Sequence, residues 1–237
     1  MAIHNPGVAA AGPPATFSGT GAQARPRPAR LRAGLDGRDA HSPPGDDVLP
    51  WLPASPLHNI DDAEGVLGAI RTTRSGTPID IILHTPGGLV LAASQIASAL
   101  AEHDGPVSAI IPHYAMSGGT LIALGADAIN VDPHAALGPV DPQLGEYPAA
   151  SIIVAAEQAK EPEDRTLILA DVGRKAIWQV EHFVQELLVR HMQPAQAREV
   201  ARILATGTWT HDHPLQPREL KALGLPVEVD VPGACTT

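Results

Sequence analysis

The chain has 237 residues, and 44% of them are hydrophobic, which is enough for one sizeable domain with a real apolar core. Its formal net charge of -10 at pH 7 argues against a general nucleic-acid-binding surface, because such a surface needs a basic field. The single cysteine, Cys235, excludes an internal disulfide, and its place close to the end of the sequence argues against a catalytic thiol.

Residues 1–50 differ from the rest of the chain, since they are rich in Pro, Gly, Ala and Arg and have almost no large aliphatic periodicity. Such a segment buries too little apolar surface to offset its ordering entropy, so we expect a disordered tail there, with a solvated RPRPARLR stretch. Neither a secretory signal nor an apolar run of about 18 residues is found, and this favours a cytoplasmic protein.

The folded domain is expected over residues 51–237, where strand patterns alternate with helix patterns. Its first helix runs to about Arg71, because Asn59 or Asp61 can accept the free amide hydrogens of a first turn. The elements that follow, in chain order, are a buried strand over 79–83, a helix over 89–102, a buried strand over 107–111, a helix over 118–124 and a short strand over 128–131.

A loop is predicted between Asp132 and Pro148, which contains four prolines and two glycines. The clearest helix comes after residues 161–164. Its single apolar stripe consists of Ile177, Val180, Val184 and Leu187. A shorter helix is expected over 194–204, with its proline in the first turn, where the missing N–H has no partner anyway. The alternation predicts an α/β fold with a mainly parallel sheet covered by helices.

Two glycine turns follow predicted strands. The first reads Thr-Pro-Gly-Gly over 85–88, and the second reads Ala-Met-Ser-Gly-Gly-Thr over 115–120, directly before a helix. In open α/β sheets, ligands bind at the carboxyl ends of the strands, where both turns are expected. The two turns together, in this order, indicate a functional site more strongly than either alone.

The second turn has the chemistry of acyl transfer, which needs a nucleophile and amide donors for the developing oxyanion. Ser117 at the start of a helix lies beside free backbone amides and the positive end of the helix dipole. Gly118 can offer its N–H at close range, and Gly87 and Gly88 can present another from the neighbouring strand end.

The stretches IDIILHTPGGLVLAASQIASAL and VSAIIPHYAMSGGTLIALGADAINVDPHAALGPVDPQLG resemble the serine dehydrogenase proteinase family of Clp-fold serine proteinases. That family is similar to signal peptide peptidase A and to the stomatin-associated membrane proteases. The resemblance covers roughly residues 59–227.

The resemblance implies the Clp/crotonase fold, a homo-oligomer and a serine peptidase that acts through a Ser/Lys dyad and an acyl-enzyme. It places the nucleophile on Ser117 and the oxyanion-hole amides on Gly88 and Gly118, with Gly87 shaping the turn. A peptide or protein is then the substrate, a membrane protein is a candidate partner, and neither a metal nor an organic cofactor is needed.

The general base is the less direct assignment. Clp peptidases have a catalytic histidine in the loop after the helix that begins at the nucleophile. In this sequence the matching position falls near Val140 or Asp141, so the Clp-type histidine is missing. His134 matches a different, non-catalytic position. The stomatin-associated relatives begin a long helix with a catalytic lysine, and Lys175 matches that position. A lysine serves as base only when burial away from acids lowers its pKa.

Two other residues compete for the role of base. Lys160 lies among glutamates, which favour a solvated surface lysine. His211 belongs to a Thr-His-Asp-His-Pro cluster that could also bind metal, although a structural turn is favoured. His84 and His113 flank the two glycine turns and are expected to be structural.

Three alternative functions remain open from the sequence. A crotonase-type acyl-CoA enzyme would use the same two-amide oxyanion hole. An α/β-hydrolase would use Ser117, Asp171 and His211 in that order, but Ala115 replaces the first glycine of its usual serine motif. A catalytically inactive member of the family would be a scaffold for a membrane-protein partner.

Overall fold

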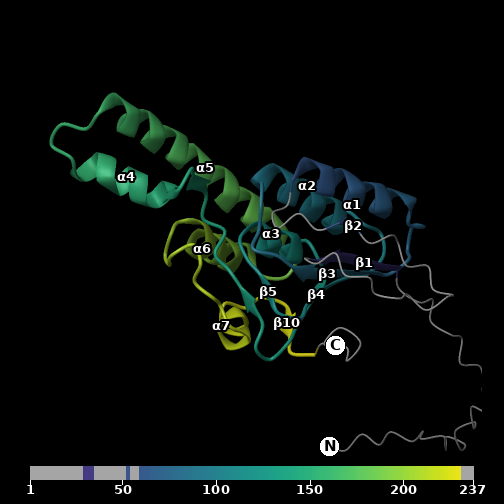
Figure 1. The fold of residues 1–237 in the computed structure, drawn as a ribbon. Coiled ribbons are helices and arrows are strands. Elements are labelled where there is room, and N and C mark those ends of the chain that lie inside the picture. The colour runs from purple at the N-terminus through teal and green to yellow at the C-terminus, as the bar shows by residue number, and fades with distance from the viewer. Residues whose placement is uncertain (1–28, 35–51, 54–58, 231–237) are drawn as a thin grey trace, which may run out of the picture.

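The structure is a computed structural model, and it describes residues 29–34, 52–53 and 59–230 (Figure 1). Its centre is a six-stranded sheet with the order β10-β6-β4-β3-β1-β2, in which every neighbouring pair is parallel. The strands are β1 (Ala29–Gly34), β2 (Leu52–Pro53), β3 (Ile79–His84), β4 (Val107–Ile111), β6 (Ala128–Val131) and β10 (Val227–Glu228). The predicted α/β fold with a mainly parallel sheet is confirmed.

Part of the expected tail belongs to this sheet. Ala29–Gly34 pairs along its whole length with Ile79–His84, which differs from the tail expected over 1–50 at these six residues. The two strands are joined by backbone hydrogen bonds, which the amino-acid composition of the segment does not reveal. Strand β3 pairs with β4 along one edge, so its other edge is available to pair with β1. The other residues of the expected tail lie outside the described residues, as does Cys235.

Three helices pack against the strands and against one another. They are α1 (Ile60–Thr72), α2 (Val90–Ala101) and α3 (Gly118–Leu124). Asn59 caps α1 in a reciprocal pair with Asp62, so Asn59 rather than Asp61 fills the predicted cap position. Every residue of α3 is buried, which fixes the helix that begins directly after Ser117.

The C-terminal half of the domain contributes four more helices. They are α4 (Ala149–Gln158), α5 (Asp164–Leu188), α6 (Pro194–Ala205) and α7 (Pro217–Ala222). Helix α4 and the first part of α5 lie side by side and project from the body as an arm (Figure 1). The predicted stripe on α5 is buried at Val180, Val184 and Leu187, while Ile177 is half-buried.

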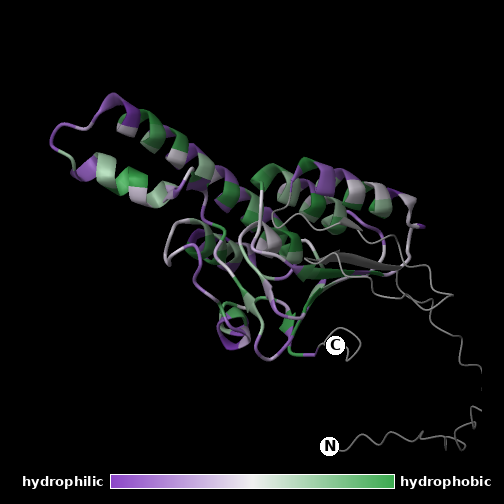
Figure 2. Ribbon diagram, in the orientation of Figure 1, coloured by the Kyte–Doolittle hydropathy of each residue, from purple (hydrophilic) through white to green (hydrophobic). Residues whose placement is uncertain are grey.

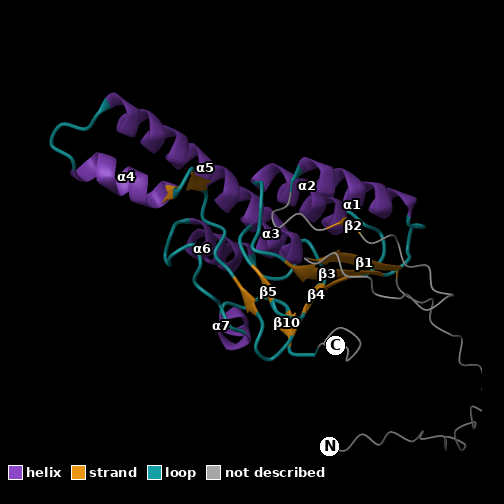
Figure 3. Cartoon of the chain, in the orientation of Figure 1, coloured by secondary structure: helices purple, strands orange, loops and turns teal. Residues whose placement is uncertain are grey.

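The predicted loop over 132–148 contains short strands (Figure 3). Strand β5 (Tyr114–Ala115) pairs in parallel with β7 (Ala136–Leu137), and β8 (Gln143–Leu144) forms a hairpin with β9 (Tyr147–Pro148). Pairs of two residues are too short for a periodic pattern, so the sequence predicted none of them. No helix within the described residues is long and apolar enough to cross a membrane.

Candidate active site

Ser117 has an unusual backbone conformation. Its φ of 51° and ψ of -116° make it the only non-glycine residue with a positive φ among the described residues. Such a conformation costs of the order of 1–3 kcal/mol and persists only where the surrounding structure imposes it. Ser117 is half-buried and is the N-cap residue of α3, so its side chain lies at the amide end of a buried helix.

The two glycine turns are held together by backbone hydrogen bonds. The Met116 amide donates to the Thr85 carbonyl over 2.9 Å, and the Thr85 amide donates to the Tyr114 carbonyl over 3.1 Å. These bonds form an isolated parallel bridge between Thr85 and Ala115. The first turn is therefore in fixed register with the segment that leads into Ser117.

Gly87 is required by this arrangement. Its φ is +114°, and a Cβ atom on it would lie 2.8 Å from the Cβ of Ser117 and 2.9 Å from the carbonyl oxygen of Met116. Real Cβ atoms do not approach other atoms so closely. A side chain at position 87 would thus be strained and would collide with the nucleophile's turn.

Gly88 and Gly118 are neighbours across the same junction. A Cβ atom on Gly118 would lie 3.3 Å from the amide nitrogen of Gly88. The structure therefore brings together Ser117 and the three predicted oxyanion-hole glycines. Two backbone amides from neighbouring strand ends beside one serine form an arrangement that can stabilise an oxyanion.

Thr120 ties this junction to the segment that follows β7. Its buried hydroxyl lies 2.9 Å from the carbonyl oxygens of Ala115 and Gly138 and accepts the amide of Gly138 over 3.1 Å. Gly138 also lies against Met116, since a Cβ on it would be 2.6 Å from the Met116 Cε. The segment beginning at Gly138 is thus held against the residue before Ser117 and the helix after it.

A buried carboxylate in the same segment forms an ion pair with a distant histidine. Asp141 is only 2% exposed, and its Oδ1 lies 2.9 Å from Nδ1 of His211, while its Oδ2 accepts from the Gln143 side chain over 2.8 Å. The Asp141 carboxylate, as hydrogen-bond acceptor, raises the pKa of His211 above its ordinary value. Burial of the imidazole acts in the opposite direction and lowers the pKa, but its effect is the smaller of the two. The antiparallel bridge between Leu137 and Leu215 brings the two segments together.

The contact between Asp141 and His211 is not predicted from the sequence. The two residues are 70 positions apart, so their contact depends on a long-range pairing that no local pattern shows. The pairing also separates the residues of the α/β-hydrolase alternative, because His211 binds Asp141 whereas Asp171 binds Lys175.

Lys175 lies on α5, and its side chain is 68% exposed. It forms an ion pair with Asp171 one helical turn earlier, and the described hydrogen bonds and ion pairs do not join it to Ser117. A lysine base needs burial away from acids, and a single chain does not provide this for Lys175. Lys160 is also exposed, between α4 and α5.

The remaining candidate histidines have structural contacts. His84 and His113 form an edge-to-face cluster with Tyr114, with ring centroids 4.6 to 5.3 Å apart. His213 stacks on Trp209. Within the described residues, no group of three or more His, Cys, Asp or Glu side chains is placed to hold a metal ion.

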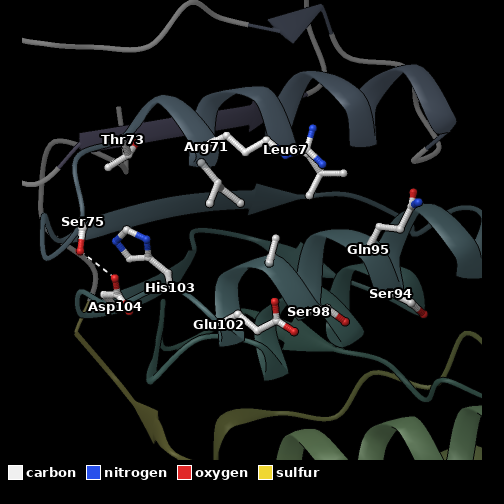
Figure 4. A pocket seen from close by; sticks show the side chains of 12 residues that line it. Leu67, Arg71, Thr73, Ser75, Ser94, Gln95, Ser98, Glu102, His103 and Asp104 are labelled. Atoms are coloured by element: carbon white, nitrogen blue, oxygen red, sulfur yellow. Dashed lines mark hydrogen bonds between the residues drawn. The ribbon is translucent and has the colours of Figure 1, made fainter.

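A separate groove of about 640 Å³ lies between the C-terminal halves of α1 and α2 (Figure 4). Its lining includes Arg71, Ser98 and Glu102, and at one end Ser75 donates a hydrogen bond to Asp104 over 2.6 Å. It contains none of the predicted site residues, so it is distinct from the Ser117 site.

Residues 51–236 match the sequence profile of a family described as ClpP-like SDH-type serine proteinases. The chain belongs to this family. The resemblance stated from the two glycine turns is therefore confirmed, and with it the assignment to a family of serine proteinases.

Curated relatives of this member of the family include two uncharacterized proteins of Methanocaldococcus jannaschii. MJ0137 is 54% identical over 183 residues, and MJ1495 is 53% identical over 182 residues; each match covers 76% of this chain. The matches cover 64% and 62% of the relatives, so the chain spans a little less than two thirds of their length. Membrane protein NfeD1b of Bacillus subtilis is 33% identical over 95 residues, covering 40% of this chain and 20% of that protein.

Two solved structures are similar in fold. A mutant of the 1510-N membrane-bound stomatin-specific protease has a TM-score of 0.49 at 21% identity, covering 74% of this chain and 76% of that one. ClpP1 from Listeria monocytogenes has a TM-score of 0.48 at 15% identity, covering 76% of this chain and 91% of that one.

Proposed function

We propose that this chain is a serine endopeptidase that cleaves peptide bonds through an acyl-enzyme on Ser117. The observation that supports this most strongly is the strained Ser117 backbone at the start of α3, held against the Gly87–Gly88 turn. Structures store strain of this kind at functional sites, and family membership provides the reaction class.

In the proposed mechanism, the Ser117 hydroxyl oxygen attacks the peptide carbonyl carbon while Lys175 takes the hydroxyl proton. The amides of Gly88 and Gly118 donate hydrogen bonds to the resulting oxyanion. The intermediate collapses, the C–N bond breaks, and the leaving amine receives the proton from Lys175. A water molecule, deprotonated by Lys175, then hydrolyses the ester and releases the acid product and free Ser117.

The role of Lys175 needs a change of surroundings. In one chain this side chain is solvated and paired with Asp171, whereas a lysine accepts a proton only after losing water contact and charged neighbours. Lys175 is preferred to Lys160, which has acidic neighbours at 157, 161 and 163. It is preferred to His211 because Lys175 matches the position of the catalytic lysine in the stomatin-associated relatives; the contact of Asp141 with Nδ1 leaves Nε2 of His211 able to accept a proton, so His211 is the rival base.

The proposal is tested by labelling the folded full chain with a fluorophosphonate probe. We expect the wild type and Lys160→Met to label, and Ser117→Ala and Lys175→Met to remain unlabelled. Lys160→Met is the matched control, because it removes an exposed lysine from the same arm. Labelling of Ser117→Ala, or no labelling of the folded wild type, would contradict the serine hydrolase. A labelled Lys175→Met with an unlabelled His211→Ala would move the base to His211.

A membrane-protein partner is part of the proposal. It is supported by the similarity of 95 residues to the membrane protein NfeD1b. Retention of the full chain on resin-bound, detergent-solubilised membrane proteins of its own host cell would support this partner, and retention equal to that on bare resin would contradict it.

A further inference from the structure

Two histidines and a tyrosine form a cluster beside the glycine turns. His84 is the last residue of β3, His113 follows the end of β4, and Tyr114 begins β5. Both histidines come at or just after the end of a hydrophobic strand (Figure 2). Two imidazoles at neighbouring strand ends are candidate metal ligands, because imidazole is the commonest metal-binding side chain.

The separation of the two imidazole rings fits a shared metal ion. Their centroids are 5.3 Å apart, and the ring planes are inclined at 69°. A zinc–nitrogen bond of about 2.0–2.1 Å puts a zinc ion ~3.2 Å from the centroid of each imidazole that binds it, so two imidazoles in tetrahedral coordination have centroids ~5.2 Å apart. The rings of His84 and His113 are therefore already at the distance that a shared ion requires.

The backbone fixes the positions of both histidines. The carbonyl of His113 accepts the Ala136 amide over 3.0 Å. The carbonyl of Tyr114 accepts the Thr85 amide over 3.1 Å, and Thr85 directly follows His84. The Tyr114 ring also packs edge-on against both imidazoles, with centroid distances of 4.6 and 5.1 Å. Ligands that are positioned before binding lose less conformational entropy when the ion arrives.

An ion can reach this cluster from solvent, because His113 is exposed and His84 is half-buried. The β1 residue in register with His84 is Gly34, which adds no side chain beside the imidazole. Binding uses one ring nitrogen of each histidine and leaves the other for a hydrogen bond, as in most metal-bound histidines. With two protein ligands, water completes the coordination of the ion.

The donor set selects the class of ion. Neutral imidazole nitrogen suits zinc, copper and nickel, whereas magnesium and calcium prefer oxygen ligands. The Thr-His-Asp-His-Pro cluster fits such an ion less well. Its His211 binds Asp141, and its His213 ring stacks on Trp209.

We propose that His84 and His113 bind one divalent transition-metal ion of the zinc class, which joins the end of β3 to the segment after β4. These two segments continue directly into the Gly87–Gly88 turn and into Ser117, so the ion stabilises the junction that carries both. The inference does not rest on the proposed function, because no step of peptide hydrolysis involves the ion.

The site is tested by titrating zinc chloride into the tag-free full chain, freed of metal with a chelator, in a calorimeter. We expect one tight zinc site in the wild type and an affinity weakened at least about tenfold in His113→Asn. His113 is chosen for substitution because its side chain is exposed, and circular dichroism checks the fold. His134→Asn is the matched control, since His134 is also an exposed histidine in a turn and lies outside the cluster.

Thermal unfolding gives a second readout. With zinc about a hundredfold above its dissociation constant, we expect the wild-type Tm to rise by about 5–10 °C and that of His113→Asn to rise much less. Magnesium at the same concentration is expected to leave both values unchanged. Equal zinc affinity in wild type and His113→Asn, or the same loss of affinity in His134→Asn, would overturn the site.

A last variant separates this inference from the proposed function. Ser117→Ala is expected to bind zinc like the wild type, because its hydroxyl is not one of the ligands. Loss of zinc binding in Ser117→Ala would place the ion at the nucleophile and overturn the assignment to the histidines. A wild type that binds no zinc would also overturn the inference, and it would leave the serine hydrolase to be decided by probe labelling.

Discussion

Nδ1 of His211 lies 2.9 Å from Oδ1 of Asp141, and this pair joins the segment that follows Gly138 to the segment that follows α6. The carboxylate is almost fully buried, whereas the imidazole is about one-third exposed. A buried carboxylate favours a cationic partner, so the pair joins two distant segments most strongly when His211 is protonated.

The first prediction concerns the pH dependence of this pair. The folded-state pKa of His211 is raised above the unfolded value, so its stabilisation is fully present below the unfolded value and is lost as the pH rises through the folded value. We expect the difference in unfolding free energy between wild type and His211→Gln to be largest at about pH 5.5 and to shrink towards about pH 8.

Urea unfolding of both proteins across this range measures the difference. His191, whose pKa is lowered mainly by burial, has the opposite effect on stability, but it is present in both proteins and cancels. A difference that is constant with pH, or that grows as the pH rises, would show that His211 is not held as a cation by Asp141.

The second prediction concerns Gly87. Gly87→Ala combines a left-handed backbone with two contacts below 3.0 Å, so we expect it to destabilise the fold by about 2–4 kcal/mol and to abolish labelling of Ser117. Gly145→Ala is the matched control, because Gly145 also has a positive φ but nothing within 4 Å of an added Cβ. It is expected to cost about 1 kcal/mol and to leave labelling unchanged.

Thermal unfolding and probe labelling distinguish the two glycine variants. If Gly87→Ala and Gly145→Ala behaved alike, strain alone would explain both, and close contact between the glycine turn and Ser117 would not be needed.

The third prediction concerns Thr120. Thr120→Val preserves the shape of the side chain but removes the hydroxyl that accepts the buried amide of Gly138 and lies within reach of two carbonyl oxygens. We expect a loss of about 1–3 kcal/mol, because a buried donor is left without a partner. Thr72→Val is the control, since the Thr72 hydroxyl is exposed and bonds only to carbonyls of its own helix.

Denaturant unfolding of the two threonine variants measures this effect. Equal stability of Thr120→Val and wild type would mean that water replaces the lost hydroxyl and that the Gly138 segment is held by other contacts.

The fourth prediction concerns the end of α5. Arg190 donates to the Gly125 carbonyl over 3.0 Å and to the Asp127 carboxylate over 2.7 Å, and Asp127 also accepts the Val107 amide at the start of β4. Arg190→Met is expected to cost about 1–2 kcal/mol, more than an ordinary surface ion pair. Arg202→Met, which loses only an exposed pair with Glu199, is expected to lower stability less than Arg190→Met does. Equal losses would show that α5 is not anchored through Arg190.

The sequence predicted the elements that carry strong local patterns. The run Ile79–Leu83 is β-branched and continuous, and the structure has a buried strand there. Helix α5 has an apolar stripe of helical period, and most of that stripe is buried. Strand β1 was missed because it is joined to β3 by backbone hydrogen bonds, to which composition gives no guide. Helix α4 was missed because it follows a proline-rich loop and is short.

Some features of the candidate site could be predicted from the sequence, and others could not. The nucleophile and its oxyanion-hole glycines could be predicted because both turns have their chemistry in consecutive residues, and the contact of Gly87 with Ser117 agrees with that prediction. The exposure of Lys175 and its ion pair with Asp171 could not be predicted, because exposure depends on which face of α5 packs against the rest of the domain.

The sequence by itself determined the family, the parallel α/β architecture and the position of Ser117 between a strand and a helix, since each depends on residues that are neighbours in the chain. Only the tertiary structure decided that Asp141 binds His211 and that the side chain of Lys175 is exposed. Both depend on contacts between distant segments, and such contacts form through the packing of the whole chain rather than through any local pattern.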